Sequence, residues 1–201
     1  MQIRLYHLKL CAFLSGLGCS TSTEPSSLPP LMPLAVGNKW IHTLFSYDTS
    51  GVLQHEWQDS IYISRDTLID GERWYIRPVN RDLGAYTNRE TGLWYRLLGP
   101  TITMEPQLVH KYPARIGDSY PFAGSDVQET VISLSQTVTT PAGSFSCLVY
   151  QVLDSTWMAS KRLYFMAPGV GPVRYEQYNR LANGSFVKVT VTELLSIRIA
   201  H

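Results

Sequence analysis

Beyond its N-terminal segment, the chain alternates apolar and polar residues with a period of two, which is typical of β-strands that bury one face. The clearest stretch is near the C-terminus, where Val187, Val189 and Val191 alternate with polar residues. Glu193 interrupts this apolar face. The pattern therefore predicts a strand over 185–199, with a β-bulge or a partnered inward carboxylate at Glu193.

Turn-forming residues recur between the alternating segments at the spacing expected of hairpins. Asn183-Gly184 is the strongest of these signals, because this pair favours a hairpin turn. No segment predicts a helix; at most a turn is expected around residues 105–109. We therefore predict an all-β fold of about ten antiparallel strands, forming a curled sheet, partial barrel or sandwich. The expected strands lie near 39–47, 54–67, 73–79, 84–87, 93–98, 101–110, 127–140, 144–153, 157–166, 172–181 and 185–199.

One pattern occurs twice, at residues 33–40 and again 80 residues later at 113–120. Both segments read Pro-x-x-aliphatic-Gly, then Asn or Asp, one further residue and an aromatic. Gly37 and Gly117 are expected to adopt positive φ in a turn that launches a strand with an inward aromatic side chain. The repeat indicates either two related β-layers or the coincidence of a common turn type.

The N-terminus is typical of an export signal. Two basic residues precede a short apolar run at 10–17, and small residues flank its end. A segment rich in Ser, Thr and Pro follows. We therefore expect a signal peptide over 1–18, a lipid-attachment cysteine with a flexible tether over 19–32, and a single β-domain over 33–201.

The sequence Leu17-Gly18-Cys19, followed by this polar tether, resembles the bacterial lipoprotein signal. In that family the cysteine sulfur receives a diacylglycerol, and the amino group released by cleavage is acylated. The resemblance implies that Cys19 is the lipidation site and holds the protein on a membrane. Ser20 after the cysteine implies the outer membrane. A plain signal peptide with an incidental cysteine is the alternative.

Charge, hydropathy and cysteine content argue against a nucleic-acid-binding protein, a membrane-spanning helix and a disulfide-bonded domain. Without residues 1–18 the chain keeps 15 basic and 16 acidic residues, a net charge of −1, which argues against a nucleic-acid partner. No apolar run approaches the roughly 20 residues of a membrane-spanning helix. Cys11 leaves with the signal, and a lipidated Cys19 leaves Cys147 alone. Cys147 is therefore expected as a small buried residue on a strand, without a disulfide.

No arrangement of residues predicts catalysis, a cofactor or a metal. The segment 117–120 resembles a serine-hydrolase block, but the repeat explains its glycine and aspartate better. The exported histidines lack the spacing of zinc ligands, and the two that flank the first hairpin are expected on its polar face, out of register. These histidines are His42, His55, His110 and His201. We therefore expect a protein that is not an enzyme.

The repeated starts at 33–40 and 113–120, together with segments 137–147 and 167–174, resemble a broad group of exported bacterial proteins and lipoproteins. The domain of that group is β-rich and has no assigned function. The resemblance covers about residues 33–199 and implies an antiparallel sheet curled into an open or partial barrel. This shape is analogous to that of periplasmic lipoprotein carriers, whose half-barrel holds acyl chains.

We therefore expect a non-enzymatic, lipid-anchored cell-envelope protein that binds a partner protein or a hydrophobic ligand. Most of the five tryptophans are expected in the core, and some on an apolar groove of the concave face. A lipid or lipoprotein carrier or sensor in the periplasm is the alternative. A hydrolase with an unrecognised site is a third possibility.

Overall fold

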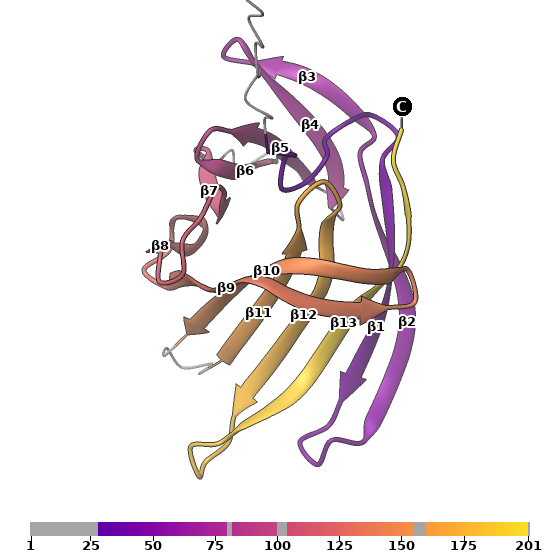
Figure 1. Cartoon of the computed structure of the whole chain (residues 1–201), viewed down its shortest axis with the longest axis vertical. Coiled ribbons are helices and arrows are strands. Elements are labelled where there is room, and N and C mark those ends of the chain that lie inside the picture. The colour runs from indigo at the N-terminus through magenta and orange to yellow at the C-terminus, as the bar shows by residue number, and fades with distance from the viewer. Residues whose placement is uncertain (1–27, 80–81, 100–103, 155–159, 201) are drawn as a thin grey trace, which may run out of the picture.

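The computed structural model describes residues 28–79, 82–99, 104–154 and 160–200. The predicted signal peptide and Cys19 lie outside the described residues. The fold is all-β, as predicted, and consists of two antiparallel sheets (Figure 1). It contains thirteen described strands rather than about ten, together with a single 3-10 turn, η1 (Phe122–Gly124).

The larger sheet has eight strands, and its order is open, with β2 at one end and β8 at the other. Its strands, in spatial order, are β2 (Leu53–Tyr62), β1 (Lys39–Tyr47), β13 (Phe186–Arg198), β12 (Gly171–Arg180), β11 (Ser160–Ala167), β10 (Gly143–Asp154), β9 (Gln128–Thr140) and β8 (Ser119–Pro121). The smaller sheet contains β3 (Arg65–Ile69), β4 (Glu72–Val79), β5 (Asp82–Arg89), β6 (Gly92–Leu98) and β7 (Gln107–Lys111).

The strand predicted over 54–67 is wrong as one element, because the chain changes sheets within it. Ile63 is buried, and its backbone N–H donates to the carbonyl of Asn38 in the large sheet's first turn. The next residue, Ser64, instead donates its N–H to Ile76 of β4 in the small sheet. Two adjacent residues thus bond to different sheets. The strand predicted over 101–110 is described only from Gln107, as β7.

The repeated turns adopt the same structure. Gly37 and Gly117 have φ of 92° and 88°. The N–H of Gly37 donates to the carbonyl of Ile63, and the N–H of Gly117 donates in the same way to Val131. Each receiving residue donates its own N–H back to the residue after the glycine, at 2.9 Å in both turns. Segments 33–40 and 113–120 therefore form the same turn, and each turn is bonded in the same way to a more distant residue.

The main core lies between the two sheets. Trp40 is fully buried there, and its indole Nε1 donates to the carbonyl of Val170 at 2.6 Å. Tyr150 and Leu194 of the large sheet and Leu93 of the small sheet pack into the same cluster. The sheets are therefore held together by apolar burial along their facing surfaces.

A second core lies on the opposite face of the large sheet. The β9–β10 hairpin bends across β11–β13 (Figure 1), and the N–H of Ala142 at its tip reaches the carbonyl of Leu194 on β13. Cys147 and Val149 of this hairpin are buried against Phe165 of β11. Both faces of the sheet's central strands are thus covered.

The N-terminal segment joins both sheets before the first strand begins. Leu31 and Met32 are buried in the main core, although they fall within the segment predicted as tether. The carbonyl of Pro30 accepts the N–H of Gly169 at 2.7 Å, beside β12. The carbonyl of Met32 accepts the amide of Asn88 on β5 at 2.9 Å. Ordered structure therefore extends N-terminal to residue 33.

The interruption predicted at Glu193 is present as both a bulge and an ion pair. Ile41 pairs with Ser196, whereas His42 pairs with Leu194, so Leu195 is the extra residue of a β-bulge. The Glu193 carboxylate lies 3.1 Å from the guanidinium of Arg174. The bulge changes the parity of the strand beyond it, so that Ile197, opposite Trp40, packs against the core on the same face as the buried Leu194.

Candidate functional site

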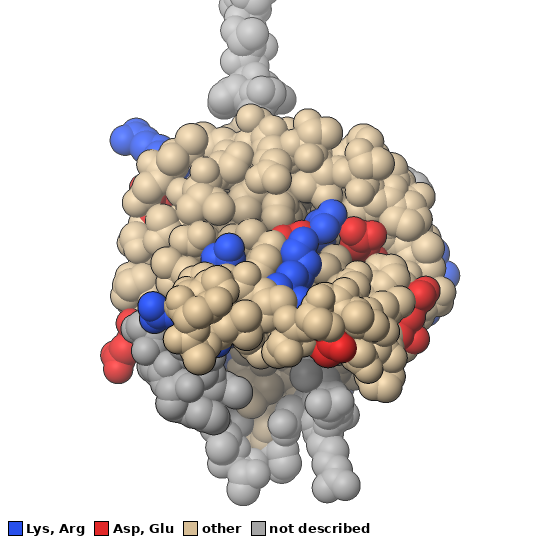
Figure 2. Space-filling model, turned by 90° about the horizontal axis from the view of Figure 1, so that it is seen from below, with Lys and Arg blue, Asp and Glu red and all other residues tan. Residues whose placement is uncertain are grey.

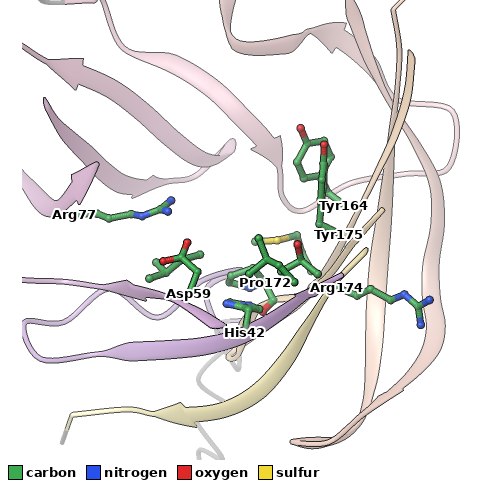
Figure 3. A pocket seen from close by; sticks show the side chains of 11 residues that line it. His42, Asp59, Arg77, Tyr164, Pro172, Arg174 and Tyr175 are labelled. Atoms are coloured by element: carbon green, nitrogen blue, oxygen red, sulfur yellow. The ribbon is translucent and has the colours of Figure 1, made fainter. Parts of the chain in front are cut away.

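A cavity of about 250 Å³ lies on the concave face of the large sheet, with one wall completed by Arg77 of β4. Figure 3 shows His42, Asp59 and Arg77 around this space, with Tyr164 and Tyr175 on its far side. The remaining lining side chains are mostly apolar, and they are Leu44, Ile61, Met166, Pro172, Arg174 and Thr192.

Strand register explains why these residues share a face. Leu44 on β1 stands opposite Thr192 on β13, and Thr192 stands opposite Tyr175 on β12. Tyr175 in turn is paired with Tyr164 on β11. Because residues in register on neighbouring strands point to the same side of a sheet, these four side chains form one row across four strands. His42, two residues before Leu44, begins the next row.

His42 is buried at the cavity wall, so its prediction as a polar-face residue is wrong. Its Nε2 lies 3.1 Å from the carbonyl oxygen of Pro172, to which the neutral ring donates. Burial lowers the pKa of His42 below its ordinary value, and this effect outweighs the opposing influence of that hydrogen bond and of Asp59. His55 pairs with Ser46, out of register with His42 as predicted.

The charged groups of the cavity are poorly paired. The Nε of Arg77 is buried and has no hydrogen-bond partner among the described residues. Asp59 accepts the N–H of Ser60 at 2.7 Å, but no ion pair between described residues joins it to Arg77. Arg174 points away from the cavity in Figure 3 and is paired with Glu176 at 2.6 Å. Arg77 is therefore the cation that this cavity offers.

A second polar cluster is sealed inside the protein, and sequence reasoning missed it. Glu129 on β9 is fully buried, and its Oε2 lies 3.1 Å from Nδ1 of His110 on β7. The hydroxyl of Tyr120 donates to the same carboxylate oxygen and accepts the N–H of Lys111 at 2.9 Å. The hydroxyl of Tyr150 donates to the carbonyl of Lys111 at 2.8 Å. This network joins the small sheet to the large one.

The sealed cluster contains a histidine, a carboxylate and a hydroxyl, but the hydroxyl is a phenol. Burial, followed by the charge of Glu129, raises the pKa of Tyr120 far above its ordinary value. A phenol that holds its proton this firmly is a poor nucleophile. None of the three side chains lines the cavity.

Tyr164 connects the two regions. It lines the cavity, and its ring lies 5.1 Å from that of Tyr175 and 5.3 Å from that of His110 between centroids. The ring of Tyr164 therefore lies between the cavity and the sealed cluster.

The remaining residues singled out from the sequence are the cysteines, His201 and the tryptophans. Cys147 is buried and free, as predicted, and burial raises its pKa to about 11. Cys19, His201 and Trp157 lie outside the described residues. Of the other four tryptophans, Trp40 and Trp74 are buried, Trp94 is half-buried, and Trp57 is 45% exposed on β2, opposite Leu44. None of these four lines the cavity.

The described part of the chain contains no group of three His, Cys, Asp or Glu side chains arranged to hold a metal ion. Within the same residues, no helix is long and apolar enough to cross a membrane. In the view from below (Figure 2), Lys and Arg side chains gather near the centre of the face, with Asp and Glu side chains beside them. This face is therefore mixed in sign.

Comparison with known proteins gives a family match and two similar folds. A candidate lipoprotein from Parabacteroides distasonis has 15% sequence identity and a TM-score of 0.46, over 85% of this chain and 99% of that chain. A candidate exported protein with a YmcC-like fold from Bacteroides fragilis has 14% identity and a TM-score of 0.45, over 85% and 100%. A search of curated proteins found no match. Residues 123–191 match the DUF3108-like family, which confirms the predicted resemblance to a β-rich domain of unknown function.

Proposed function

We propose that the protein is a non-enzymatic, lipid-anchored component of the bacterial cell envelope whose β-domain binds a hydrophobic ligand. The observation that carries this proposal is the cavity on the concave face, which the protein's own side chains leave unfilled. The anchor is an acylated Cys19, and the outer membrane is its site.

The cavity has the character of a ligand site. Ligand pockets are concave and mostly apolar, with a few polar groups that fix orientation, and they commonly measure about 300–1,000 Å³. This one, at 250 Å³, suits a small amphiphile or one end of a longer chain. Leu44, Ile61 and Met166 supply apolar contacts, and Arg77 and His42 supply polar ones.

The absence of an enzymatic role is part of the proposal, and the state of the buried groups supports it. The Cys147 thiol is held protonated by burial, as is the Tyr120 phenol. The Nε2 of His42 is directed at the carbonyl of Pro172 rather than at a hydroxyl or thiol. An activated nucleophile needs a base within hydrogen-bond reach. Cys147 and His42 lack this pairing among the described residues, and Tyr120, although it donates to Glu129, does not line the cavity.

The ligand is tested by native mass spectrometry of the full chain carrying Cys19→Ala, exported in bacterial cells and purified without detergent. We expect a population with the added mass of a small lipid. Leu44→Trp fills the cavity and should remove that population. Phe45→Trp is the matched control, since it places the same bulk one residue along the strand, on the opposite face. A clean ligand-free mass for both the parent and the control would contradict the proposal.

The anchor is tested by growing cells with radioactive palmitate. The wild-type chain should incorporate label, Cys19→Ala should incorporate none, and Cys147→Ala should label normally. Label that persists in Cys19→Ala, or that is absent from the wild type, would show that Cys19 is not the attachment site.

A carrier or sensor in the periplasm would use the same cavity but would release its ligand. The openness of the large sheet, which ends at β2 and β8 without closing, favours this second candidate. A carrier should transfer a bound lipid to acceptor vesicles within minutes, whereas a binding module should retain it.

A further inference from the structure

We propose that the cavity selects ligands with a carboxylate head and an apolar tail, and that Arg77 binds the head. This inference rests on the proposed function, because it assigns the ligand class of the same cavity. It concerns recognition only, and no chemical change of the ligand is involved.

The first step is the state of Arg77. A guanidinium carries five N–H donors and a fixed charge, and in folded proteins these donors are normally satisfied. The Nε of Arg77 is buried without a partner, and no ion pair among the described residues involves this side chain. Each unsatisfied buried donor destabilises the empty state, so a ligand that supplies acceptor oxygens gains affinity.

The second step is that no other residue of the cavity lining offers a free positive charge to an anionic head. Arg174 is engaged with Glu176 and with Glu193, at 2.6 and 3.1 Å, on the other face of the sheet. His42 is kept neutral by burial. An anionic head entering the cavity therefore meets one cation, and two oxygens of a carboxylate match the planar donor fork of a guanidinium.

The third step concerns which anion is preferred. Asp59 faces the cavity from β2, and its negative charge opposes a second negative charge on the ligand. A dianionic phosphate monoester is therefore less favourable than a carboxylate. A cationic head would be attracted by the exposed Asp59 and repelled by the half-buried Arg77, and of these two charges the half-buried one is screened less by water. Together, the charges of Arg77 and Asp59 favour a ligand head with a single negative charge.

The fourth step is the tail. Leu44, Ile61, Met166 and Pro172 form a continuous apolar wall on the sheet side of the cavity, opposite β4. A short hydrocarbon chain lying against this wall leaves its head toward Arg77. The ligand class is thus a medium-chain carboxylate or the carboxylate end of a larger amphiphile.

The test uses four eight-carbon probes with the full chain carrying Cys19→Ala: octanoate, octan-1-ol, octylamine and octyl phosphate. Isothermal titration calorimetry at pH 8 gives the dissociation constant for each. We expect octanoate to bind about tenfold more tightly than octanol, and more tightly than either other probe. Arg77→Gln should abolish the preference for octanoate over octanol. Arg77→Lys should keep part of the preference.

Arg73→Gln is the matched control. It removes the same residue type from the same strand at an exposed position, where Arg73 is paired with Asp66. The octanoate preference should be unchanged. Octanol affinity reports whether each variant still folds around its cavity.

Three results would overturn the inference. These are equal affinity for octanoate and octanol in the parent chain, tighter binding of octylamine or octyl phosphate than of octanoate, and a preference for octanoate that survives in Arg77→Gln. In each case octanol still binds, so the proposed hydrophobic-ligand function stands. If no probe binds and the chain carries no lipid, the proposed function fails, and the inference fails with it.

Discussion

The cavity and the sealed cluster are built from the same kinds of side chain, yet they differ in how those side chains are paired. Each brings together a histidine, a carboxylate and tyrosines, and Tyr164 separates the two. In the sealed cluster the Glu129 carboxylate is hydrogen-bonded to both His110 and Tyr120. In the cavity Asp59 and Arg77 face an open space without an ion pair between them. Residue types alone therefore do not distinguish a structural network from a binding site, whereas unpaired charge beside a cavity does.

The largest effect that separates the two regions should come from their carboxylates. Glu129→Ala leaves His110 and Tyr120 without their shared partner in the protein interior. We expect this to lower the free energy of unfolding by about 3 kcal/mol, measured by urea denaturation.

The matched control is Asp59→Ala, which removes a carboxylate from an exposed position on β2. Its free energy of unfolding should stay within about 0.5 kcal/mol of wild type. Equal losses in the two variants would show that the sealed cluster is no more structural than the cavity.

A smaller difference should appear between the tyrosines. Tyr120→Phe removes a hydroxyl that donates to Glu129 and accepts the N–H of Lys111. The lost pairing of two buried groups should cost about 1–2 kcal/mol in thermal or urea unfolding. Tyr175→Phe, whose hydroxyl donates to the amide oxygen of Gln177, should cost about 0.5 kcal/mol. The comparison is weakened if the order of the two losses is reversed.

The smallest effect concerns protonation at the cavity wall. Burial lowers the pKa of His42 in the folded protein, so on acidification the unfolded chain binds a proton at this residue at a higher pH than the folded protein does. Stability associated with His42 is complete above the ordinary histidine pKa of about 6.5 and is lost as the pH falls toward the lower folded value. Urea unfolding at a series of pH values should therefore show a steeper acid loss for wild type than for His42→Gln.

His55→Gln provides the control, because this histidine is exposed on β2. Its acid loss should follow that of wild type. A wild-type slope identical to that of His42→Gln would mean that the imidazole at the wall is protonated as readily in the folded state as in the unfolded state.

Much of the fold is local and could be predicted from the sequence. The alternation and turn residues place β1 at its observed bounds and predict the Asn183-Gly184 turn between β12 and β13. They fail at Ile63, where the chain passes from the large sheet to the small one between the end of β2 and the start of β3. That change depends on contacts with Asn38 and Ile76, which are distant in sequence, so a local pattern does not reveal it.

The candidate site was less predictable, although part of its signal was present. His42 has the same parity as Trp40 and Leu44 on one strand, which indicates an inward ring. Glu129 likewise stands between Val127 and Val131 at intervals of two, which indicates an inward carboxylate. Arg77 carries no comparable signal, because its role depends on the small sheet facing the large one.

The N-terminal segment has a mechanical consequence. Its backbone is bonded at Pro30 to the turn before β12 and at Met32 to β5, so it is fastened to both sheets at once. Leu31 and Met32 insert between them. Any force that reaches the domain through this segment is shared by the two sheets and resisted by the core, rather than being concentrated on a single edge strand that could be peeled away.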